Sequence, residues 1–333
     1  MIGTGRKSER GAALITVLMI IAAMSVAALA VTQAVTSATQ RARALDAQAQ
    51  LSFHAISAEE VAKARLMTIL EPLESRLSAD LPGFGEPQIV PIDGGAFAVS
   101  VRDATNCFDV NKLTVGAEGG ARVADQAVQE SYRLLLDGAL EEGFTSDIVS
   151  LVSALTDWMD DNSVPGDGGA EDSYYLSEVP SYRTSNQPLA TIEELRAVRG
   201  YTPDVIAVLH PLLCALPSET RRNTSALNIN TLEDYHAPLL QLAFDGAIEL
   251  DQARELIVTR PQGGWASAQD LLEDPIVQRI DPEKIKVERL GVVTSLVEVT
   301  ANVSYRGHDM TMRYLFEAEA GRPISTLRRE RIG

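Results

Sequence analysis

The chain has 333 residues, of which 45% are hydrophobic, and its formal net charge at pH 7 is −17. This length allows more than one hydrophobic core, whereas the acidity argues against a nucleic-acid partner, because like charges repel. There is no tandem repeat, and HExxH, GxSxG, the P-loop and a complete GxGxxG are absent, so we predict no enzyme.

An uncharged apolar stretch covers residues 12–31 near the start of the chain. A helix of this length reaches about 30 Å, the thickness of the hydrocarbon core of a bilayer. Arg6, Lys7 and Arg10 precede it, and the positive-inside bias places this end in the cytoplasm and the rest of the chain outside. The sequence therefore predicts a single membrane-spanning helix.

The helical pattern continues beyond the membrane span. No Gly or Pro occurs between residues 12 and 71, and Pro72 predicts the end of the helix. We expect one long spine helix within residues 12–80. Its distal half has apolar residues at roughly the spacing of 3 and 4 that predicts one buried stripe: Leu45, Ala49, Phe53, Ile56, Ala64 and Leu66.

Two processing events are compatible with this N-terminus. A secretory signal peptide would be cut after Ala30, at an A-x-A site. Alternatively, a basic leader that ends in Gly and is followed by an apolar, then amphipathic, helix resembles type IV pilins and the pseudopilins of type II secretion. That resemblance implies a leader of residues 1–11, cut between Gly11 and Ala12 by a prepilin peptidase that methylates the new N-terminus. We favour it, because a discarded signal gives no reason for the helix to continue.

The sequence has two cysteines, Cys107 and Cys214, in the region expected outside the cytoplasm. An even pair in an oxidising compartment predicts one disulfide. It would close a loop of about 100 residues, for which the chain-entropy model gives roughly 4 to 5 kcal/mol. The alternative is two separate buried thiols.

The remainder of the chain predicts an α+β fold. Apolar alternation indicates a strand at Phe97, Val99 and Val101, and a later hairpin that turns at Arg306 and Gly307. Since neither is stable alone, we expect one small antiparallel sheet, packed on the spine helix. The expected divisions are a β region at 81–115 and 286–320, an inserted all-α domain at 116–285, and a basic tail at 321–333.

The densest group of charges is the stretch DWMDDNSVPGDGGAEDSYY, residues 157–175. Its carboxylates repel one another, and Ca²⁺, which takes six to eight oxygen ligands, would remove that repulsion. Val164 and Pro165 exclude an EF-hand register. The alternatives are a solvated acidic loop and, less favoured, a tethered hydrolase that uses paired carboxylates. The acidic residues are Asp157, Asp160, Asp161, Asp167, Glu171 and Asp172.

The order of DWxD at 157–160, GAEDxYY at 169–175 and SYRT at 181–184 resembles the K-type minor pseudopilins of the type II secretion system. The resemblance extends over nearly the whole chain. It implies a protein of the bacterial inner membrane with a periplasmic globular region, and as partners the other minor pseudopilins, the major pseudopilin and the inner-membrane secretion platform. It also implies bound Ca²⁺, with Asp160, Asn162, Asp167, Glu171 and Asp172 as ligands.

Thr16 is the fifth residue after the implied cleavage, where most pilin-like subunits have Glu. In that family the carboxylate is thought to offset the charged N-terminus of a neighbour. A subunit without it is expected at the tip of the pseudopilus, where it would support initiation and protein export. The alternatives are an ordinary threonine in a membrane helix and a minor type IV pilin in pilus priming or adhesion.

Residues 226–244 also resemble helix-hairpin-helix modules, but the Gly-x-Gly turn that would bind phosphate is absent. We therefore interpret Asn228 and Asn230 as turn and cap residues. The sequence FDVNKL around Asn111 is similar to LNINTL around Asn230, which indicates a local turn used twice.

Overall fold

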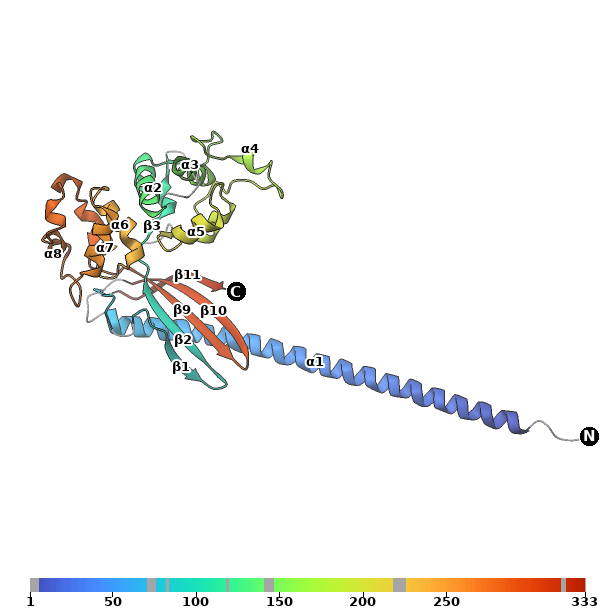
Figure 1. Ribbon diagram of the computed structural model, residues 1–333. Helices are drawn as coiled ribbons and strands as arrows, with labels where there is room; N and C mark the ends of the chain where they lie inside the picture. The colour runs from blue at the N-terminus through green and yellow to red at the C-terminus, as the bar shows by residue number, and fades with distance from the viewer. Residues whose placement is uncertain are drawn as a thin grey trace, which may run out of the picture.

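The structure is a computed structural model that describes residues 6–70, 76–81, 84–117, 120–140, 147–217, 226–318 and 322–332, with side chains from residue 13. Helix α1 (Arg6–Leu70) projects far beyond a body that consists of a sheet and a group of helices (Figure 1). The predicted α+β class with a long N-terminal spine helix is confirmed. Pro72 lies outside the described residues.

The sheet has five strands in the order β1-β2-β9-β10-β11, all antiparallel. Strand β2 pairs with β9, so the predicted early strand and late hairpin do share one sheet. The hairpin turns at Arg306 and Gly307, both with positive φ, as a two-residue hairpin turn requires. The strands are β1 (Gln88–Ile92), β2 (Gly95–Asp103), β9 (Leu296–Tyr305), β10 (His308–Glu317) and β11 (Ser325–Ile332).

The prediction of a basic tail at 321–333 is wrong for the described residues, because β11 is the edge strand beside β10. The register shifts between Leu315 and Phe316, so that Leu327 is an extra residue in β11. This bulge lets Thr326 and Arg329, three residues apart, both reach Glu59 of α1. The prediction failed because the sequence of this edge strand is so rich in charged residues that it resembles a solvated tail.

The predicted buried stripe of α1 is also wrong, except for Leu66. Leu45, Phe53 and Ile56 are 68%, 64% and 60% exposed. The stripe that packs on the sheet is rich in alanine, which lets the helix approach the strands closely. It consists of Ala47, Leu51, Ala55, Ala58, Ala62, Leu66 and Leu70.

The inserted part is mainly helical, as predicted, and has two hydrophobic cores. Val110, Leu113 and Leu290 belong to these cores, so the expected divisions at 115/116 and 285/286 fall inside the insert. The α-helices are α2 (Gln126–Ala139), α3 (Ile148–Met159), α4 (Asp172–Tyr175), α5 (Pro203–Leu209), α6 (Ala237–Ala243), α7 (Leu250–Val258) and α8 (Ala268–Leu272).

Short elements complete the insert. The strand pairs are β3 (Phe108–Asp109) with β6 (Leu213–Cys214), β4 (Thr114–Gly116) with β5 (Arg122–Ala124), and β7 (Leu227–Asn228) with β8 (Leu290–Gly291). The 3-10 turns are η1 (Val110–Leu113), η2 (Ile192–Ala197), η3 (Asp234–His236), η4 (Val277–Arg279), η5 (Pro282–Lys284) and η6 (Val287–Arg289).

The local turn is used twice, as the similarity around Asn111 and Asn230 predicts. The Asn111 side chain accepts from the Leu189 N–H at 2.8 Å and donates to the Leu189 carbonyl at 3.0 Å. The Asn230 side chain makes the same pair of bonds to Trp265, at 2.8 and 2.9 Å. A capping box follows two residues after each contact, Thr191 with Glu194 and Ser267 with Asp270. Each half of the insert thus has an asparagine side chain that binds the backbone two residues before a capping box, although the sequence contains no tandem repeat.

Candidate functional site

Asp157, at the end of α3, closes the acidic loop on itself. Its carboxylate accepts hydrogen bonds from the Gly166 N–H at 3.1 Å and the Ala170 N–H at 2.9 Å. A Cβ at Gly169 would lie 1.9 Å from Asp157 Oδ2, so only glycine fits at this position. The Gly-rich sequence of the loop is therefore needed for the chain to fold around one carboxylate.

Asp160 and Glu171 are buried beside Asp157, at 2% and 3% exposure. Glu171 Oε1 has no hydrogen-bond partner. Burial, followed by the charges of Asp157 and Asp160, raises the pKa of Glu171 to about 7, and burial raises the pKa of Asp157 to about 6. Burial also raises the pKa of Asp160. Since no cation pairs with these three carboxylates in the described part of the chain, a divalent cation fits the chemistry of the group.

The structure brings only part of the predicted ligand set to this group. Asn162 donates to Asp160 Oδ2 at 2.7 Å, while Asp167 is exposed. Asp172 pairs instead with Arg183 and Thr184; burial raises its pKa, but bonds from Thr184 and Arg183 outweigh this and lower it. Among the described residues, no three His, Cys, Asp or Glu side chains form a ready metal-binding group.

Helix α1 is the one described helix long and apolar enough to cross a membrane, and its apolar part is not covered by the rest of the chain. Thr16 lies in this part, where its hydroxyl donates to the Ala13 carbonyl at 2.8 Å. Gly11 and Ala12 belong to α1, but the burial of side chains is described only from residue 13. Toward the body, α1 presents exposed apolar residues, three of them large, on the side away from the sheet. We call Leu45, Ala49, Phe53, Ile56 and Ala64 the outward stripe.

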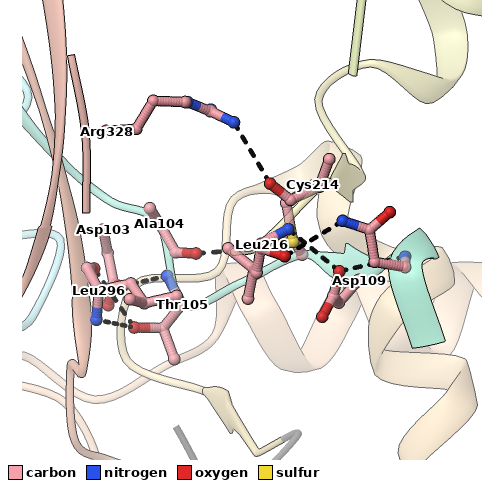
Figure 2. The surroundings of a disulfide bond; sticks show 11 residues. Asp103, Ala104, Thr105, Asp109, Cys214, Leu216, Leu296 and Arg328 are labelled. Carbon is pink, nitrogen blue, oxygen red and sulfur yellow. Dashed lines mark hydrogen bonds between the residues drawn. A yellow bond between two sulfur atoms is a disulfide. The ribbon is translucent and has the colours of Figure 1, made fainter. Parts of the chain in front are cut away.

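The predicted disulfide is present. Cys107 and Cys214 are bonded, with their Cα atoms 5.7 Å apart, and they connect the chain that enters the insert with β6 (Figure 2). Beside them, the Thr105 hydroxyl accepts from the Leu296 N–H at 3.2 Å, at the start of β9. The segments that lead into and out of the insert are therefore held together.

A buried joint centred on Asp103 adds to this connection. Asp103 Oδ2 accepts from Asn228 Nδ2 at 2.9 Å and from the hydroxyls of Thr231 and Thr294 at 2.7 Å each. These partners come from the middle and from the end of the insert, while Asp103 ends β2. Sequence reasoning recognised Asn228 only as a turn residue, because the residues to which its Nδ2 donates are more than 60 residues away.

Two family models for type II secretion system protein K match the chain, over residues 106–218 and 227–292. These ranges coincide closely with the two halves of the insert. Each half therefore corresponds to one module of that family.

Protein K of Pectobacterium carotovorum subsp. carotovorum is 33% identical over 268 residues, which cover 80% of either chain. Protein K of Klebsiella pneumoniae is 31% identical over 278 residues, which cover 82% of either chain. Among solved structures, a chain of the GspK-GspI-GspJ complex from the enterotoxigenic Escherichia coli type 2 secretion system matches with a TM-score of 0.72. It is 27% identical, and the match covers 88% of this chain and 99% of that chain. With this identity and coverage, and with both family models matched, the chain belongs to the type II secretion system protein K family of minor pseudopilins.

Proposed function

We propose that the chain is an inner-membrane subunit that packs through its spine helix against the other minor pseudopilins and the major pseudopilin, and so supports pseudopilus initiation and protein export. Its N-terminus is cytoplasmic and its body periplasmic, next to the secretion platform. The observation that carries the proposal is the outward stripe. The structural neighbour comes from a complex of three such proteins, which supports it.

The outward stripe resembles one side of a helix–helix interface. From Leu45 to Ile56 its spacing of 3 and 4 residues is that of helix packing, and its three large side chains are exposed on the side away from the sheet. Exposed large apolar residues extend through the membrane span to Val35 and occur again from Leu45 to Ile56 of the same helix. A partner helix that enters from the membrane would bury both parts.

Thr16 supports a place at the tip. A Glu at this position would offset the N-terminal charge of a subunit stacked above it, and an unpaired charge in an apolar bundle is unfavourable. Since Thr16 carries no charge, it offers no such pairing. This is tolerable where no subunit lies above.

A charge in the outward stripe tests the proposal. We expect Phe53→Glu to reduce secretion of exoproteins at least tenfold, because it places a carboxylate in a helix–helix contact. Thermal unfolding should be unchanged, since Phe53 is 64% exposed. Gln48→Glu, which is exposed on another side of α1, is the control. Lost pilus-dependent motility with normal secretion would instead support the alternative, a minor type IV pilin.

Processing is tested by N-terminal sequencing of the protein isolated from membranes. We expect the mature chain to begin at Ala12, carrying a methylated amine. A chain that begins at Val31 would show that the apolar stretch is a secretory signal and would contradict both the processing and the spine-packing proposals.

We also propose that the acidic loop binds Ca²⁺. Asp160 and Glu171 would be the central ligands, with Asp157 beside them and Asn162 or Asp167 completing the oxygen set; Asp172 is already neutralised by Arg183. The support is the buried Glu171 Oε1, which has no hydrogen-bond partner, within a group of carboxylates that no cation among the described residues balances. When bound, the cation would supply the charge compensation that this loop lacks.

Calcium should raise the melting temperature of the full chain in detergent, because a ligand that binds only the folded state stabilises it by mass action. Glu171→Gln should abolish the rise, while Glu178→Gln, in an exposed segment, should keep it. Magnesium should substitute poorly, since it requires octahedral geometry. A melting temperature that chelation leaves unchanged would remove the claim.

A further inference from the structure

The inner face of the sheet is wider than the helix that covers it. Helix α1 packs mainly against β9 and β10, and Glu59 connects it to β11. Five strands span about 19 Å, whereas a helix with its side chains is about 10 Å across. No described helix therefore covers the inner face of β1 and the neighbouring part of β2.

An apolar groove, which we call the edge groove, lies at this place. It has a volume of about 170 Å³. Val61 on its wall is 40% exposed, so the groove opens to the surface. The walls come from α1, from β1 and β2, and from the chain before them: Val61, Ala62, Leu66, Ile69, Leu77, Leu81, Phe84, Val90, Val99 and Val101.

The size of the edge groove limits what can enter it. An apolar cavity of about 150 Å³ accommodates benzene. The groove therefore has room for one aromatic ring or one branched aliphatic side chain, and not for a strand or a helix. A single large apolar side chain in a pocket is a typical anchor of a protein interface.

The rim of the edge groove adds a charge. Arg65 and Gln88 line the groove, and both are exposed. Arg65 has no ion-pair or hydrogen-bond partner in the part of the chain that the structure describes. In a chain of net charge −17, an unpaired arginine beside an apolar cavity favours a partner that offers a carboxylate next to its apolar anchor.

The arrangement of the wall residues points to a helix that crosses α1. Val61, Arg65 and Ile69 are four residues apart, so they form one ridge on the helix surface. Such ridges fit the grooves of a second helix that crosses at about 50°. Toward the membrane the same side of α1 carries Ser57, His54 and Gln50, which are polar and do not favour a helix running alongside.

We propose that the edge groove receives one large apolar side chain from the helix of a neighbouring pseudopilin, and that a carboxylate about one turn away on that helix pairs with Arg65. This inference rests on the proposed function, since it takes the partner from the same assembly. Because the edge groove and the outward stripe lie on different sides of α1, the chain contacts two neighbours at once.

Site-directed photo-cross-linking of the full chain in its native membrane tests this. A benzoylphenylalanine at Gln88 reports on the groove, and one at Phe53 reports on the outward stripe. We expect the adduct from Gln88 to map, by mass spectrometry of the linked peptide, to the helix of a pseudopilin. An adduct within this chain itself, or none, would overturn the proposal.

Two substitutions sharpen the test. Val61→Trp fills the groove and Arg65→Glu reverses its charge; each should lower the yield from Gln88 about tenfold, as loss of one anchor contact does. Arg65 is exposed, so its substitution should not unfold the chain. Ile89→Trp, on the same strand but 74% exposed outside the groove, is the matched control and should leave the yield unchanged.

The outcomes separate the two claims. If Val61→Trp and Arg65→Glu leave the Gln88 adduct intact, or if that adduct is absent while the Phe53 adduct persists, the edge groove is not an interface and the proposed function stands. If both adducts are absent, the proposed function fails as well.

Discussion

Asp103→Ala should lower the melting temperature by roughly 4 °C or more and make the sheet and the insert unfold in two separate transitions. The carboxylate accepts hydrogen bonds from Asn228, Thr231 and Thr294, and their donors would lose it in a site where Asp103 itself is 7% exposed. Each of the three buried donors left unsatisfied costs about 1 kcal/mol or more, so a total of at least about 3 kcal/mol is expected.

Calorimetry of the full chain in detergent measures both effects. Two transitions are expected because the joint connects the sheet to the insert, so its loss uncouples their cores. Asp137→Ala, an exposed position on α2, is the control and should change the melting temperature by less than about 2 °C. A single transition at the wild-type temperature in the Asp103 variant would show that the joint contributes little.

Glu59→Gln should detach the C-terminal strand and lower stability by roughly 2 to 3 kcal/mol at pH 7. Glu59 is 2% exposed and accepts from Arg329 at 2.7 and 2.9 Å and from Thr326 at 2.7 Å, with Lys63 Nζ at 2.8 Å. An uncharged amide cannot form the paired bonds to the guanidinium. Faster hydrogen exchange in β11 than in β9 would measure the detachment.

The same carboxylate gives a dependence on pH. Burial raises the pKa of Glu59, but hydrogen bonds from Arg329, Lys63 and Thr326 outweigh this and lower it from 4.5 to about 2. A carboxyl with a lowered folded-state pKa stabilises the protein above its unfolded pKa, and this stabilisation is lost as the pH falls. The difference in stability between wild type and Glu59→Gln should therefore shrink between about pH 5 and pH 2.

The neighbouring residue provides a matched control. The Glu60 side chain is 68% exposed and pairs only with Lys63 among the described residues. Glu60→Gln should therefore cost at most about 0.5 kcal/mol. Equal losses in the two variants, or unchanged exchange in β11 after Glu59→Gln, would contradict a role for Glu59 in holding the strand.

Much of the architecture could be predicted because it depends on local periodicity. The uncharged stretch, the alternation in β9 and β10 and the turn at Arg306 and Gly307 specify their elements through backbone geometry and hydrophobic spacing. Proximity of Cys107 and Cys214 was a hypothesis that only the fold could decide.

The sequence could not tell which apolar stripe of α1 is covered by its own chain. Both stripes have helical spacing, and the one with larger side chains is the exposed one. Contact with the sheet favours small residues such as Ala55 and Ala58, because they allow close approach. Periodicity shows that one face of a helix is apolar. Whether that face packs against the same chain or against a partner depends on the assembled structure.

For the acidic loop as well, the sequence determines the composition and the tertiary structure determines which side chains meet. The sequence by itself determined that carboxylates and glycines concentrate at residues 157–175, because composition is enough to show an excess of charge. Only the tertiary structure decided that Asp157, Asp160 and Glu171 lie together while Asp172 turns to Arg183. It also decided that Arg329 reaches Glu59 across 270 residues. Such pairings depend on which segments packing brings side by side, and no local pattern encodes that.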